Sequence, residues 1–116
     1  VEHEWAVGSG ADAERRLHGI LPGGLVARNR VEQMTALQME GGGIEGRPWQ
    51  QTGYGLGLMM GQVEGGANIL GHSGCGPFSA NFVAHFPDRG VTVSSFAQGG
   101  DETPAEWETL RVAACR

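Results

Sequence analysis

Residues 78–86 alternate apolar and polar side chains, and this segment limits the fold of the chain more than any other. The apolar positions share one face of an extended strand: Phe78, Ala80, Phe82, Ala84 and Phe86. Such alternation is typical of a half-buried strand, because successive side chains of a strand point to opposite faces. Pro87-Asp88-Arg89-Gly90 follows with the residue types of a tight turn, so 91–97 should return antiparallel beside 78–86. The sequence therefore predicts an antiparallel meander.

Two earlier segments alternate in a similar way. Residues 54–63 and 67–72 are predicted strands, separated by a turn at Glu64-Gly65-Gly66. Helical spacing of apolar residues predicts three helices near 11–21, 30–38 and 104–114.

The second and third predicted helices carry residues with the spacing of a capping box. These residues are Asn29 with Glu32, and Thr103 with Glu106. The closing helix should place Trp107, Leu110 and Ala114 on one face, packed on the sheet.

The expected fold class is α+β, an antiparallel sheet meander with a C-terminal helix packed on it and two helices N-terminal to it. We expect residues 1–116 to form a single partial domain, with a helical and loop segment at 1–50 and the sheet plus closing helix at 51–116. The chain does not begin with Met and its first eight residues have no clean period, which favours a piece of a longer protein.

Charge and cysteine usage exclude several classes of protein. The formal net charge is -5, all eight basic residues are Arg, and no basic run occurs, so nucleic acid is not an expected partner. No apolar run reaches the roughly 20 residues of a membrane span. Cys75 and Cys115 lack zinc-site spacing, so we expect no metal, no cofactor and two free thiols rather than a disulfide. The cellular compartment stays open.

The glycine-rich stretch from Gly71 to Phe78 holds the candidate site residues. Glycines let a backbone pass close to a bound substrate, because they carry no side chain to block the approach. His72 can supply a hydrogen bond or exchange a proton near neutral pH. Ser73 is its neighbour along a strand and should point to the opposite face, so the two side chains should not form a contacting pair.

Each of these residues also has a structural interpretation. His72 could be a strand histidine bonded to a backbone carbonyl, Ser73 a strand hydroxyl, and Cys75 a small buried filler. Three further histidines are interpreted as surface or edge residues: His3, His18 and His85. Trp49 and Tyr54 are interpreted as core or loop anchors.

Three motifs, taken in order, connect the chain to a known superfamily. They are Gly53-Tyr54-Gly55-Leu56-Gly57, Gly71-His72-Ser73-Gly74 and Phe86-Pro87-Asp88-Arg89-Gly90. With the predicted elements around them, they resemble the C-terminal part of the serine β-lactamase and penicillin-binding-protein superfamily, closest to its class C, esterase and D-aminopeptidase branch. The resemblance runs from about residue 11 to residue 110 and implies a partial β-lactamase-like fold.

The resemblance also implies site roles. The superfamily carries Ser-x-x-Lys, Ser-Asp-Asn and Lys-Thr-Gly motifs, and His-x-Gly often replaces the last of these in the branch resembled here. His72-Ser73-Gly74 matches that third element, which implies that His72 is catalytic and that Ser73 and Gly74 line the substrate site. The resemblance likewise makes the backbone N–H of Cys75 one of two oxyanion donors, a role that could contribute a few kcal/mol to transition-state stabilisation.

The sequence departs from the superfamily at the nucleophile. It contains no Lys, so no Ser-x-x-Lys exists, and Tyr54 is followed by Gly-Leu rather than by the pattern Tyr-x-Asn. We therefore expect a C-terminal fragment of a β-lactamase-like serine hydrolase, inactive alone, whose parent acts on a small-molecule or peptide substrate such as a β-lactam, a D-peptide or an ester.

Two alternatives belong to other classes. A non-catalytic binding or assembly module of the same fold would use its exposed sheet surface for association, including assembly as a homo-oligomer. An α/β-hydrolase nucleophile elbow would take Ser73 as nucleophile within Gly71-His72-Ser73-Gly74-Cys75. The elbow is disfavoured because it must lead directly into a helix, whereas a strongly alternating segment follows here.

Overall fold

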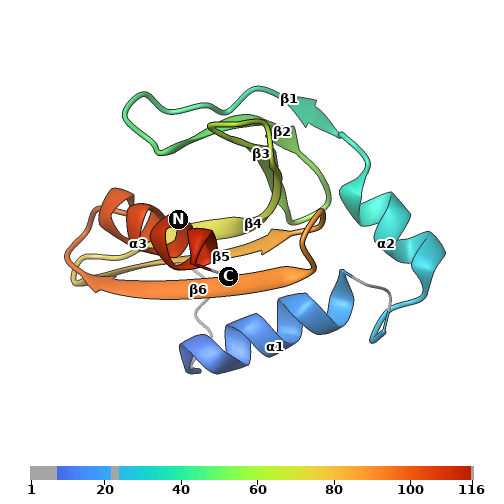
Figure 1. The fold of residues 1–116 in the computed structure, drawn as a ribbon, viewed down its shortest axis with the longest axis horizontal. Coiled ribbons are helices and arrows are strands. Elements are labelled where there is room, and N and C mark those ends of the chain that lie inside the picture. Colours follow the sequence, from blue (N-terminus) through green and yellow to red (C-terminus); the bar gives the residue numbers. More distant parts are fainter. Residues whose placement is uncertain (1–7, 22–23, 116) are drawn as a thin grey trace.

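The computed structural model describes residues 8–21 and 24–115. Six strands form one antiparallel sheet in the order β1-β2-β3-β4-β5-β6, so every strand pairs with its neighbour in the chain (Figure 1). The elements are α1 (Gly10–Ile20), α2 (Arg28–Thr35), β1 (Met39–Glu40), β2 (Trp49–Tyr54), β3 (Met59–Val63), β4 (Asn68–Cys75), β5 (Ser79–Phe86), β6 (Val91–Gln98) and α3 (Thr103–Ala114).

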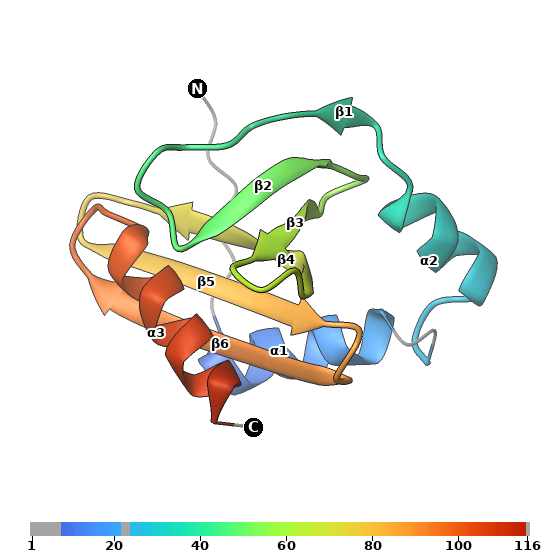
Figure 2. The same cartoon turned by 45° about the horizontal axis from the view of Figure 1, so that its top comes forward.

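Helices α1 and α3 pack on opposite faces of the β5–β6 end of the sheet (Figures 1 and 2). Ser94 of β6 donates its side-chain hydroxyl to the Glu14 carboxylate of α1 over 3.0 Å. The next residue, Ser95, contacts α3 instead, with its hydroxyl 2.6 Å from that of Thr109. Because neighbouring residues of a strand point to opposite faces, these two contacts place the two helices on different sides.

The hydrophobic core lies between the sheet and α3. Its buried residues come from the strands and from one stripe of the helix: Trp49, Ile69, Phe82, Ala84, Phe86, Val93, Ala105 and Ala113. Strand β5 supplies three of them at every second position, as the alternation predicts. Phe78 precedes the first residue of β5 and is 85% exposed, so the predicted apolar face is correct only from Ala80 onward.

The predicted fold class is confirmed: the chain is an α+β protein with an antiparallel meander and a C-terminal helix on the sheet. Strands β5 and β6 pair antiparallel from Ser79↔Gln98 to Phe86↔Val91, and Gly90 in their turn has a φ of 64°. No helix of the described residues is both long and apolar enough to cross a membrane. The assignment of one partial domain to residues 1–116 stays a prediction.

The single strand predicted over 54–63 is wrong. Tyr54 ends β2, a tight turn follows in which Gly55 donates its N–H to Leu58 O over 2.8 Å, and β3 starts at Met59. Gly57 has a φ of 73° in this turn, a conformation that glycine adopts without strain. The alternation of glycine with apolar residues therefore reflects a hairpin connection and not one continuous strand.

The two predicted capping boxes are also wrong. Helix α2 has Ala27 as its N-cap, with no side-chain cap bond, and Asn29 lies inside the first turn. Helix α3 has Glu102 as its N-cap, because the backbone N–H of Thr103 donates to Asp101 Oδ1 over 2.9 Å and Thr103 is already helical. The described helices carry one capping box, Ser9 with Asp12 at α1.

The buried face of α3 differs from the predicted one. Trp107 is 59% exposed and Ala114 is exposed, whereas Leu110 is half-buried. The residues that face the sheet are instead Ala105, Glu106, Thr109 and Ala113. This face places the Glu106 carboxylate against a buried arginine in the loop before β2, as described below.

Candidate active site

Strand β4 carries all four predicted site residues, and it extends three residues past the predicted end at His72. It pairs with β5 from Leu70↔His85 to Cys75↔Ala80. Its pairing with β3 ends earlier, at Met59↔Gly71. Within the described part of the chain, residues 72–75 therefore present a strand edge that no neighbouring strand covers.

His72 and Ser73 point to opposite faces of β4, as the alternation predicts. The His72 side chain is exposed, whereas Ser73 is 4% exposed on the face that α3 covers. The two side chains do not form a contacting pair, and the candidate catalytic imidazole lies on the face opposite α3.

Both ring nitrogens of His72 have partners. Nδ1 lies 2.5 Å from the backbone oxygen of Ser73, and Nε2 lies 2.5 Å from the hydroxyl oxygen of Tyr54. A carbonyl oxygen only accepts, so the Nδ1 proton is the one donated to Ser73. In the neutral ring Nε2 is then the acceptor, and the Tyr54 hydroxyl donates to it. The carbonyl bond agrees with the structural interpretation of His72, but the contact with Tyr54 goes beyond it.

Cys75 is exposed, so its interpretation as a buried filler is wrong. Its backbone N–H has a defined direction. Gly76 donates to Ser79 O over 2.8 Å, and in an antiparallel ladder the backbone groups of successive residues alternate between the two sides of a strand. The Cys75 N–H therefore points away from β5, toward the uncovered edge of β4. Cys115 is also exposed, and both thiols are free.

The buried side of β4 rests on a polar cluster that the sequence did not reveal. We call it the Arg47 cluster: Arg47, Gln51, Ser73, Glu102 and Glu106. The Arg47 side chain is 6% exposed and donates to Glu102 Oε2 over 3.1 Å, to Gln51 Oε1 over 3.1 Å and to Ser73 Oγ over 3.3 Å. Its guanidinium also lies 5.6 Å from the centre of the Trp49 ring, within cation–π range.

Glu106 gives the cluster a buried acid. Its carboxylate is fully buried, and Oε1 forms an ion pair with Arg47 Nε at 3.2 Å. Burial raises the pKa of Glu106, and the neighbouring Arg47 charge opposes this shift without cancelling it. Sequence reasoning missed Arg47 because a lone arginine in a glycine-rich loop has no motif, and its acidic partners come 55 or more residues later.

The two glycines of the Gly71-His72-Ser73-Gly74 motif have different surroundings. A Cβ on Gly71 would lie 2.1 Å from the carbonyl oxygen of Val83, so this glycine allows β5 to pack closely rather than a substrate. A Cβ on Gly74 would meet the side chain of Asn81 at 3.5 Å, an ordinary contact distance. Gly74, and not Gly71, has free space beside it.

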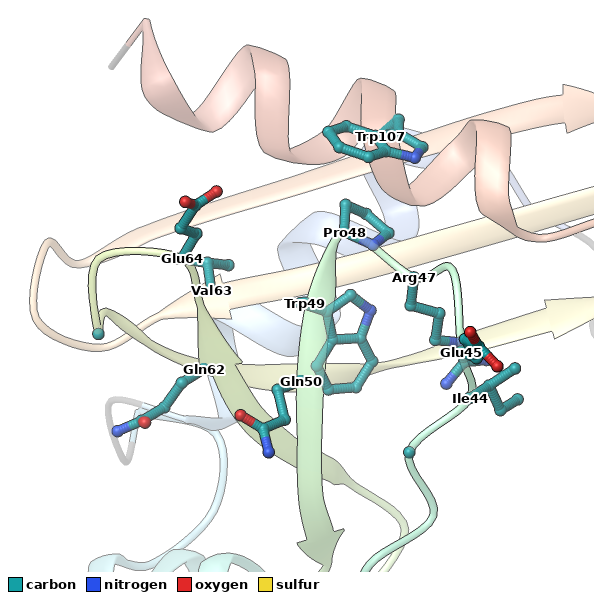
Figure 3. A pocket seen from close by; sticks show the side chains of 12 residues that line it. Ile44, Glu45, Arg47, Pro48, Trp49, Gln50, Gln62, Val63, Glu64 and Trp107 are labelled. Carbon is teal, nitrogen blue, oxygen red and sulfur yellow. The ribbon is translucent and has the colours of Figure 1, made fainter.

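A groove of about 630 Å³ lies between α3 and the start of the β2–β3 hairpin (Figure 3). Trp107 projects from α3 above Pro48, while Glu64 marks the end of β3 on the other side. Trp49 and Val63 line the groove and pack in the core beneath α3, so it opens on the face opposite His72. It contains none of the predicted site residues.

The structure contradicts two other interpretations of site residues. Ser73 lies within β4, the next element is β5, and its hydroxyl is buried against Arg47. A nucleophile elbow needs an exposed serine between a strand and a helix, so the elbow interpretation is wrong. His85, interpreted as a surface or edge residue, is 4% exposed and hydrogen-bonds Thr92 over 2.8 Å. His18 is exposed, as expected, and His3 lies outside the described residues.

No protein-family model matches the sequence, and no curated protein matches it. Among solved structures, the chain is similar to the crystal structure of a D-stereospecific amidohydrolase from Streptomyces sp., with a TM-score of 0.58 and 24% sequence identity. The match covers 89% of this chain and 28% of that one. This likeness shows the fold, and the chain spans little more than a quarter of the length of the amidohydrolase.

Proposed function

We propose that this chain is the C-terminal part of a β-lactamase-like serine hydrolase, in which it contributes the His72-Ser73-Gly74 strand. The observation that carries the proposal is the position of this motif on β4. Its histidine is exposed opposite α3, and the N–H of Cys75 points to the edge that β3 leaves uncovered. A substrate carbonyl at this edge would have both groups within reach.

The similar structure supports the reaction class. An amidohydrolase transfers an acyl group from an amide to water, and the D-stereospecific enzyme has the present fold as one part of its chain. The order of the three sequence motifs supports the same class independently, because the motifs resemble those of enzymes that form an acyl intermediate on serine.

The chain would supply electrostatic stabilisation and a proton-exchanging group. A backbone N–H that points at the developing oxyanion stabilises the transition state by a few kcal/mol, which is the role proposed for Cys75. His72 would polarise the substrate or take part in proton transfer. The nucleophilic serine and the lysine that activates it would come from another part of the parent protein, because this sequence has no Lys.

The kinetic test uses the parent protein with a chromogenic β-lactam, a p-nitrophenyl ester and a D-amino-acid amide. Replacing His72 by Ala should lower kcat/KM by roughly ten- to a thousandfold, the range for loss of a positioned proton-transfer or hydrogen-bonding group. Ser73→Ala should lower it much less, and His18→Ala, at an exposed histidine on α1, is the matched control. Full activity of the His72→Ala protein would return this histidine to a structural role.

The isolated chain provides a second test. It should give no turnover and no covalent adduct by mass spectrometry, since an unactivated serine hydroxyl is a poor nucleophile. A stable acyl adduct on any serine of the chain would refute the assignment of the nucleophile to another part of the protein.

A non-catalytic binding module of the same fold remains the second candidate, and one observation favours it. Phe78 is 85% exposed next to the site strand, and exposed apolar side chains are a feature of association surfaces. Such a module would leave the parent protein without hydrolase activity on all three substrates, whereas the hydrolase would act on at least one of them.

A further inference from the structure

His72 has no free polar atom in its neutral ring. The Nδ1 proton is donated to the Ser73 carbonyl, and the Nε2 lone pair accepts the Tyr54 hydroxyl, each over 2.5 Å. The remaining ring atoms are carbons, which do not exchange protons. Any proton that reaches the imidazole from outside the pair must therefore arrive at Nε2, the position that Tyr54 occupies.

The backbones on both sides of this contact are fixed. The backbone oxygen of Tyr54 accepts the Gln38 N–H over 2.9 Å, and Tyr54 pairs with Met59 in the β2–β3 hairpin. His72 pairs with Val83 in the β4–β5 ladder. The two rings lie edge to face, with centroids 5.8 Å apart and an interplanar angle of 89°. The sheet therefore fixes the positions of the two backbones from which these side chains meet.

We propose that the Tyr54 hydroxyl is the group through which His72 exchanges protons in the reaction, so that the two residues act as one relay. This proposal rests on the proposed function. The phenolic oxygen keeps lone pairs that can accept a hydrogen bond from a reacting group, since its own proton points to Nε2. Tyr54 is half-buried and His72 is exposed, which leaves the relay open on the face opposite α3.

The transfer is balanced without any other reactant. As water attacks the acyl group on the serine, its oxygen bonds to the acyl carbon and one of its protons bonds to the Tyr54 oxygen, while the original hydroxyl proton passes from that oxygen to His72 Nε2. The phenol is regenerated, the imidazole becomes an imidazolium, and the Nδ1 proton stays on its bond to the Ser73 carbonyl. The reverse transfer returns a proton to the leaving group.

The first experiment measures kcat and KM across pH for the parent protein carrying Tyr54→Phe, His72→Ala or both. Each single variant should lower kcat/KM by roughly ten- to a thousandfold. The kcat/KM of the double variant should be no lower than that of the less active single variant, because the effects of substitutions within one relay are not additive. The pH-dependent limb that disappears in His72→Ala should also disappear in Tyr54→Phe. Thr52→Val removes an exposed hydroxyl from the same strand and should leave the kinetics unchanged.

The outcomes distinguish a failure of the Tyr54–His72 relay from a failure of the proposed function. If His72→Ala keeps full activity, the role of His72 in the proposed function fails. If His72→Ala is impaired while Tyr54→Phe has the activity and pH profile of the unaltered protein, the relay is overturned and His72 acts directly.

A second experiment needs no activity. Nitrogen-15 NMR of the imidazole in the 116-residue chain should show a neutral His72 ring protonated at Nδ1, and Tyr54→Phe should shift the Nε2 resonance away from its hydrogen-bonded value. The amide resonances of β5 should stay in place, which shows that the fold is intact. A neutral ring protonated at Nε2 would contradict the relay.

Discussion

Arg47 holds together segments that are far apart in the sequence. Its guanidinium contacts Ser73 on β4, Gln51 on β2 and the two acidic residues at the start of α3. Glu102 and Glu106 are thereby fixed below the strand that carries the candidate site. A single buried cation thus couples the position of α3 to the position of β4.

Removal of this cation should destabilise the fold. Arg47→Met leaves the fully buried Glu106 carboxylate without its counter-charge, and loss of one partner of a buried pair costs about 3–5 kcal/mol in the free energy of unfolding. Urea denaturation of the chain measures the change. The double variant Arg47→Met/Glu106→Gln removes both charges and should regain part of the loss. Equal stability of Arg47→Met and the unaltered chain would show that the ion pair contributes nothing.

At the residue scale, the sequence predicts what depends on neighbours in the chain. Strand alternation alone predicts that the side chains of His72 and Ser73 lie on opposite faces of β4, and the structure confirms it. The Tyr54–His72 contact spans 18 residues and the Arg47–Glu102 contact spans 55. Neither pair has a spacing that marks it, so both require the folded arrangement to be found.

Among the strands, β4 depends on a glycine for its close approach to β5. Gly71→Ala would press a methyl group against the Val83 carbonyl, and such overpacking costs typically about 1–3 kcal/mol. Gly74→Ala is the matched control, because its methyl group meets Asn81 at an ordinary distance and should cost less than about 1 kcal/mol. Chemical denaturation of the two variants compares them, and equal losses would contradict the role assigned to Gly71.

The elements that the sequence predicts best are those with a single consistent signal. Strands β5 and β6 combine alternation with an unambiguous turn, and both appear near their predicted bounds. The segment 54–63 alternates as well, but several of its alternate positions are glycines (Gly55, Gly57 and Gly61), which fit a hairpin turn as readily as a strand. Helix α3 forms as predicted, yet its buried face includes Glu106, the partner of Arg47, and helical periodicity cannot register a contact with a residue 59 positions away.

Over the whole molecule, stability should depend on pH through His85, which lies between the sheet and α1. Burial, and then the charge of His18 with its ring 5.9 Å away, lower the pKa of His85 from its ordinary value of 6.5. The unfolded chain therefore binds the proton more readily, so the free energy of unfolding should be fully retained above about pH 6.5 and should fall as the pH drops below it.

Thermal or urea unfolding between pH 7 and pH 5 tests this dependence. The variant His85→Gln should lose most of the slope, whereas His72→Ala, at an exposed histidine, should keep it. An unchanged slope in His85→Gln would assign the pH dependence to other groups.

Helix α1 is attached to the sheet by contacts between residues that lie far apart in the sequence. Each strand of the meander pairs with the one just before it, whereas the hydrogen bonds from α1 to β6 join residues 74 to 84 positions apart. Closing so long a loop costs more conformational entropy than pairing adjacent strands, and contacts of this range form slowly. During synthesis the strands can pair in turn as they leave the ribosome. Helix α1 is made before every strand it packs on, and it has to wait for β6, about eighty residues later, before it can dock.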